Sequence, residues 1–169
     1  MPISMHQASI SVFTRSLAAL DAILDKAVAH AEARKIDPDA LLTARLFPDM
    51  FNFTKQVQLT TDFAKGAASR LTGVEIPKYP DDEKTFAELK ARIAKTIAYL
   101  DAFKPEQFGG SDDKEITFPA GPDKSLTLPG SRYLVGVAHP NFYFHLTTAY
   151  DILRHNGVEL GKRDFIGRP

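Results

Sequence analysis

Apolar side chains recur every three or four residues through four long stretches of this chain, and that spacing is the strongest constraint on its fold. In the first stretch, residues 4–34, the repeating positions are Ile10, Phe13, Leu17, Leu20, Leu24, Ala27 and Ala31. Similar stripes run through residues 48–72, 85–104 and 139–157. This spacing places the apolar groups on one face of a helix, and such faces bury one another in a bundle. We therefore predict an all-α, up-and-down four-helix bundle that spans residues 1–169 as a single domain.

Residues that favour helix starts separate these stretches. Asp37 and Pro38 have the types expected of an N-cap and a first-turn proline, so we predict a short helix that runs to about Arg45. Thr85 and Glu88 have the spacing of a capping box, in which each side chain bonds a free backbone N–H of the other residue. The helix over residues 85–104, the third stripe, therefore has a well-defined beginning.

The region before the last stretch changes from helical to alternating spacing. Residues 115–118 and 125–128 alternate polar with apolar side chains around a turn-forming segment, which predicts a small β-hairpin. An isolated hairpin is marginally stable in water, so we expect it to lie against the bundle. Residues 131–138 favour a short helix, whereas residues 157–169 favour an irregular tail anchored by Phe165.

Composition limits the function classes that this chain can serve. The 169 residues carry 21 basic and 21 acidic side chains, and this neutral balance disfavours nucleic acid as a partner. The chain contains no cysteine, which excludes disulfides, thiolate metal sites and a cysteine nucleophile. No apolar run reaches the length of a membrane span, and residues 1–15 lack the pattern of a signal peptide. We therefore expect a cytoplasmic protein that does not contact membranes.

The last stretch, residues 139–157, contains the best candidate for a functional site. Polar side chains recur there at three- and four-residue steps next to the apolar stripe, so they share one side of the helix. Polar groups beside a core need a partner, a water or an ion. We predict a small polar pocket in the bundle core that either binds a small polar molecule or is a satisfied polar core, in which His145 is buried and hydrogen-bonded to a neighbouring helix. Its candidate residues are Gln58, Asp62, Asn141, Tyr143 and His145.

The histidine pattern is poor for a metal centre. His155 lies nearly three helical turns from His145, and His139 precedes Pro140, which disfavours regular helix at that position. A catalytic zinc usually takes three protein ligands, mainly imidazole or carboxylate. We therefore predict no cofactor. The alternative is a weakly held zinc or nickel ion, for which the ligand set is His145, Asn141 and Gln58.

Acid–base catalysis is a further alternative. A carboxylate from Asp62 or Asp151 could orient His145 as a general base. Both carboxylates also have a basic residue three positions later, Lys65 and Arg154, and we favour ion pairing as their role. The sequence contains neither a nucleophile-elbow motif nor a phosphate-binding loop.

Three consecutive aromatic residues predict an intermolecular contact. Phe142, Tyr143 and Phe144 point in different directions around one helix, so some of them must leave the intramolecular core. Aromatic side chains are common in homodimer interfaces. We therefore expect a homodimer, and an interaction module built on this face is one alternative function.

Three segments carry a resemblance to a known superfamily. They read RLFPDMFNFTKQVQLTTDFAKGAASRLTG, DDEKTFAELKARIAKTIAYLD and PNFYFHLTTAYDILRHNGVELGKRDFIG. Together they resemble an uncharacterised bacterial domain-of-unknown-function family within the DinB/YfiT-like superfamily. The resemblance implies a four-helix bundle with a long arm between the second and third helices, and frequent dimers. Active superfamily members are similar to metal-dependent thiol transferases or hydrolases.

The resemblance also implies where a metal would lie. Active members carry one histidine in the second long helix and two, four residues apart, in the last helix. Aligned on the LRHNG end at residues 153–157, His145 matches the second of that pair, Asn141 falls on the first, and Gln58 falls near the remaining histidine. One ligand of three is retained. We therefore predict a degenerate, metal-free site, with a metal-dependent hydrolase or thiol transferase as the alternative.

Overall fold

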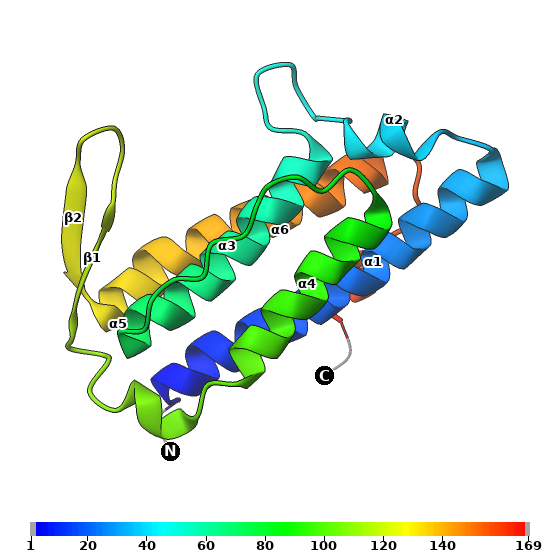
Figure 1. The fold of residues 1–169 in the computed structure, drawn as a ribbon. Helices are drawn as coiled ribbons and strands as arrows, with labels where there is room; N and C mark the ends of the chain where they lie inside the picture. Colours follow the sequence, from blue (N-terminus) through cyan, green and yellow to red (C-terminus); the bar gives the residue numbers. More distant parts are fainter. Residues whose placement is uncertain (1–2, 168–169) are drawn as a thin grey trace.

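The structure is a computed structural model that describes residues 3–167, and it is mostly helical with one small hairpin (Figure 1). The long helices are α1 (Val12–Arg34), α3 (Phe53–Thr72), α4 (Phe86–Asp101) and α6 (His139–His155). Shorter helices are α2 (Pro38–Leu42), α5 (Gly130–Tyr133) and α7 (Lys162–Ile166). Two π-helical turns, η1 (Gln7–Ser11) and η3 (Leu134–Ala138), precede α1 and α6, and a 3₁₀ turn, η2 (Pro105–Phe108), follows α4.

The long helices do not simply alternate in direction. The starts of α3 and α4 meet, with the rings of Phe53 and Phe86 5.8 Å apart, and Ser69 and Tyr99 near their ends share a 2.8 Å hydrogen bond. These two helices are therefore parallel, and residues 73–85 return along the bundle between them (Figure 1). The predicted up-and-down order is wrong at this step, because a connector of this length can cross back over a bundle.

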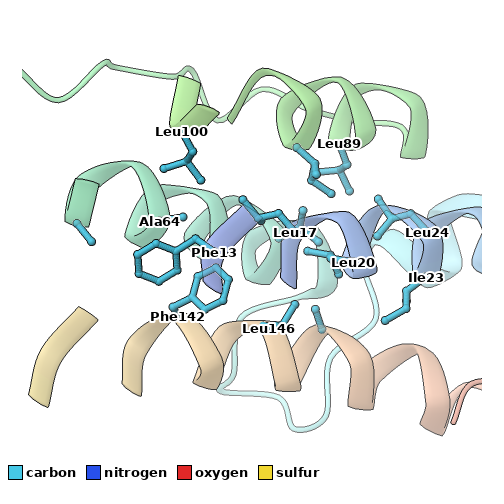
Figure 2. Packing of buried hydrophobic residues seen from close by; sticks show 14 of the residues in the cluster. Phe13, Leu17, Leu20, Ile23, Leu24, Ala64, Leu89, Leu100, Phe142 and Leu146 are labelled. Atoms are coloured by element: carbon cyan, nitrogen blue, oxygen red, sulfur yellow. The ribbon is translucent and has the colours of Figure 1, made fainter. Parts of the chain in front are cut away.

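The buried core lies between the four long helices. Figure 2 shows Phe13, Leu17, Leu20 and Leu24 of α1 pointing into the space between α4 and α6. The ring of Phe13 meets that of Phe142 edge to face, with centroids 4.8 Å apart. The predicted stripe of the first helix is thereby confirmed as the central face of the core.

Local side-chain caps set the helix starts. The Asp37 side chain accepts a backbone N–H of α2, and Thr85 and Glu88 form the predicted capping box. The third helix begins at Phe53 rather than at residue 48, because the Asn52 side chain caps it there.

The predicted β-hairpin is confirmed. Strands β1 (Glu115–Pro119) and β2 (Ser125–Pro129) pair antiparallel. Ile116 and Phe118 are buried, and the Phe118 ring lies 5.1 Å from that of Tyr133 in α5. One face of the hairpin is therefore tied to the end of the bundle.

The chain passes from α5 through η3 into α6 without a break. His139 is the first residue of α6 and has helical backbone angles, so the prediction that it lies outside regular helix is wrong. The wider π turn directly before Pro140 explains the difference, since it changes the hydrogen-bond register where proline lacks an N–H.

The tail is more ordered than the sequence suggested. Residues 162–166 form α7, which packs on α1 and is held there by a 2.7 Å ion pair between Asp164 and Lys26. Phe165 lies against Tyr150, with ring centroids 5.7 Å apart, so its predicted role as an anchor agrees with the structure. Within residues 3–167, no helix is long and apolar enough to cross a membrane.

Candidate functional site

His145 sits on the face of α6 that packs against α3, and it is 8% exposed. Its Nδ1 lies 2.8 Å from Oε1 of Gln56, a buried residue in the first turn of α3. The Phe63 ring is stacked on the imidazole at 5.5 Å between centroids, and the Phe144 ring meets it edge-on at 5.2 Å. The imidazole is thus held in one orientation by a hydrogen bond and two aromatic rings.

The hydrogen bonds of Gln56 fix the tautomer of His145. The backbone oxygen of Phe51 can only accept, so the Gln56 amide nitrogen donates to it, at 3.2 Å. The amide oxygen then faces His145 and can only accept, so Nδ1 must carry the proton. In the neutral ring the lone pair therefore lies on Nε2.

Nε2 is the available atom of this imidazole. It makes no hydrogen bond with residues 3–167. Among these residues, the side-chain polar atom that is fully buried without a partner is Thr14 Oγ1, so the unpartnered Nε2 of His145 is not fully buried. Nε2 therefore keeps access to solvent. Burial lowers the pKa of His145 from 6.5 to about 4, and the positive charge of Lys55 adds to this shift. At neutral pH the ring offers an acceptor rather than a charge.

The other predicted pocket residues do not gather around His145. The Gln58 amide instead donates to Glu83 at 2.8 Å, because two residues along a helix turn a side chain to the opposite side. The Asn141 side chain bonds the Val137 carbonyl of its own helix at 2.8 Å. Tyr143 lies on the outer side of α6 and is 37% exposed.

Asp62 belongs to a separate ion cluster between α3, α4 and the connector. Its carboxylate accepts from Arg92 at 2.8 Å and from Lys65 at 3.0 Å. Arg92 also donates to Thr61, to Glu83 and to the Pro80 carbonyl. Asp62 therefore has the ion-pairing role that the sequence favoured.

Comparison with known proteins places this chain in a family. The sequence model described as "Domain of unknown function (DUF1993)" matches residues 5–166. The chain belongs to the DUF1993 family. A DinB family member protein from Shewanella denitrificans, solved by crystallography, is 44% identical, with 98% of this chain and 93% of that chain covered and a TM-score of 0.90. No curated protein matches the chain. The predicted membership of an unknown-function, DinB-like family is confirmed.

The DinB-like fold implies a metal centre, and the residues of this DUF1993 member do not fit one. Within residues 3–167, no group of three or more histidine, cysteine, aspartate or glutamate residues could hold an ion. At His145 the neighbouring groups are an amide and two phenyl rings. A divalent cation would meet a single imidazole there, with no second nitrogen or carboxylate ligand beside it.

The low pKa of His145 predicts a specific loss of stability in acid. In the unfolded chain the imidazole takes up a proton below about pH 6.5, whereas in the folded protein it stays neutral down to about pH 4. The unfolded state therefore binds more protons between these values, and stability falls as the pH drops through that window. At about 1.4 kcal/mol per unit, we expect a loss of about 2–3 kcal/mol between pH 7.5 and 4.5.

Denaturant unfolding of wild type and His145→Asn at both pH values measures this contribution. Asparagine keeps a side-chain N–H near the position of Nδ1 but does not titrate, so the variant should lose about 2–3 kcal/mol less than wild type. Equal losses in the two proteins would contradict a buried, neutral His145.

Proposed function

We propose that this DUF1993 protein is a metal-free, DinB-like bundle that binds a small polar molecule through Nε2 of His145. The observation that carries the proposal is the hydrogen-bond chain from Phe51 through Gln56, which fixes the proton on Nδ1 and leaves the Nε2 lone pair open. A buried side chain whose orientation and protonation are both set is suited to recognising one kind of partner.

The surroundings define the chemistry of the ligand. Nε2 accepts, so the ligand needs an O–H or N–H donor. Phe63 and Phe144 flank the imidazole and favour an apolar or aromatic body next to that donor. Lys55, whose charge contributes to the low pKa of His145, is itself paired with Asp81 at 2.6 Å, so no unpaired charge beside the ring favours an ionic ligand. A small neutral alcohol, phenol or amide meets these requirements.

Nitrogen NMR of ¹⁵N-histidine protein tests the proposal with phenol, acetamide and methanol as probes. We expect phenol to shift the Nε2 resonance of His145 saturably, with a millimolar dissociation constant. His145→Asn keeps a donor for Gln56 but removes Nε2, so it should lose this binding. The variant Arg132→Gln, at an exposed position of α5, serves as a control and should bind phenol as wild type does.

Two results would overturn the proposal. One is the absence of any saturable shift with all three probes. The other is zinc or nickel bound near one equivalent per chain in elemental analysis and lost in His145→Ala, which would instead support a metal-dependent enzyme.

A homodimer is a second proposal, supported by the outer face of α6. Pro140, Tyr143, Phe144 and Thr147 are all exposed there, at spacings that place them on one side of the helix, and Phe144 is 57% exposed. Exposed aromatic groups of this kind are typical of subunit contacts. We expect sedimentation to show a dimer for wild type and a folded monomer for Phe144→Asp. A wild-type monomer at tens of micromolar would rule out this interface.

A further inference from the structure

A groove of about 1350 Å³ lies on the side of the molecule away from His145. Its floor is the outer face of α1, and its two walls are the end of α4 with η2 and the short helix α7. Its volume is above the usual range of 300–1000 Å³ for small-molecule sites, which suits an elongated occupant. Neither the DinB-like fold nor the proposed role of His145 accounts for this groove.

The floor is a straight row of mainly small side chains. Thr14, Ala18 and Ala22 follow one another at four-residue steps along α1, Ile10 of η1 continues the row four residues earlier, and all of them line the groove. Twelve residues of helix extend about 18 Å, so the row forms a track of that length. Apolar groups also come from the walls, at Phe103 and Ile166. A track of this length with short side chains matches a linear apolar chain.

The charges along the groove favour an anion. Arg15, Lys104 and Arg163 line it, and none of them has an ion-pair partner among residues 3–167. Of the two carboxylates in the lining, Asp164 is already neutralised by Lys26 at 2.7 Å, so Asp101 alone opposes the three cations. Arg15 lies three residues before Ala18 and four before Ala19, which also lines the groove, so its side chain is within reach of a group lying on the floor.

We propose that this groove binds an amphipathic carboxylate, with its apolar chain on the alanine row of α1 and its head group at Arg15. The row of small side chains on the floor fits the apolar chain, and the excess of unpaired cations fits the negatively charged head group. It is independent of His145, which lies on the opposite helix pair.

Calorimetry with dodecanoate, below the concentration at which it forms micelles, tests the proposal. We expect one dodecanoate per chain with a micromolar dissociation constant, at least tenfold weaker binding of dodecanol, and none of dodecyltrimethylammonium. Arg15→Gln should weaken dodecanoate binding about tenfold and leave dodecanol binding unchanged. Ala18→Leu, which fills the floor, should weaken both ligands at least tenfold.

Matched variants separate a specific site from general adsorption. Ala91→Leu makes the same change at an exposed position of α4, and Arg132→Gln makes the same charge change on α5, and both should bind dodecanoate as wild type does. Unsaturable binding, or equal binding by Ala18→Leu, would overturn the proposal. So would a self-association that Ala18→Leu abolishes and dodecanoate does not alter, because the groove would then hold a second copy of the chain.

Discussion

Replacing Arg92 with methionine should lower the free energy of unfolding by about 3–5 kcal/mol, because it removes the buried cation that is paired with the largely buried carboxylate of Glu83. The Arg92 side chain is 2% exposed, and its guanidinium contacts the carboxylates of Asp62, Asp81 and Glu83 at 2.8–3.1 Å. Without it, the carboxylate of Glu83, whose side chain is 10% exposed, loses its charged partner in a place that water reaches poorly. For a chain of this size the loss corresponds to a melting temperature about 6–20 °C lower.

A more exposed ion cluster on the same helix, centred on Lys90, provides the control. Lys90 bonds Asp21 and Asp25 at 2.7–2.8 Å, but all three side chains are partly or well exposed. Lys90→Met should therefore cost less than about 1 kcal/mol. Arg92→Met should also speed cleavage of residues 73–85 by a protease, since Arg92 fastens this connector to α3 and α4. Equal destabilisation by the two substitutions would show that burial of the Arg92 cluster adds nothing.

The helices could be predicted from the sequence because each one is specified locally. The apolar stripe of α1 and the capping box at Thr85 and Glu88 act within a few residues, so periodicity and residue type are enough to find them. The direction of α4 is different. It depends on how the connector is fastened to α3 by contacts such as that of Arg92 with Asp62, thirty residues apart, and with Tyr79, and the stripes carry no information about these contacts.

The hydrogen-bond partner of His145 also could not be predicted from the sequence, because it depends on which face of α3 meets α6. Helix α3 carries polar side chains on two of its sides, and the sequence alone does not say which neighbouring helix each side faces. Gln56 and Phe63, seven residues apart, face His145, whereas Gln58 and Asp62 face the connector and α4. The seven-residue spacing of Gln56 and Phe63 was visible in the sequence. Knowing that this side meets α6 required the packing of the helices.

Gly130→Ala should destabilise the protein by about 3 kcal/mol or more, because the backbone leaves no room for a methyl group there. A Cβ at this position would lie 1.9 Å from the backbone oxygen of Ser111 and 3.2 Å from Cδ2 of Leu71. The Gly130 N–H also donates to the Lys114 carbonyl at 2.9 Å, so the clash would pull apart the junction between the hairpin and the bundle.

Gly136→Ala is the matched control, since the two glycines lie in the same helical run. A Cβ at Gly136 meets no atom within 4 Å, and alanine restricts the unfolded chain more than glycine does. This substitution should therefore be neutral or stabilise by up to about 1 kcal/mol in thermal unfolding. If the two alanine variants melt at the same temperature, Gly130 cannot be the contact that holds the hairpin to α3. If they differ as expected, the absence of a Cβ at Gly130 is what allows residues 111–114 to pack against the start of α5. A methyl group at this position would then detach the hairpin from the bundle.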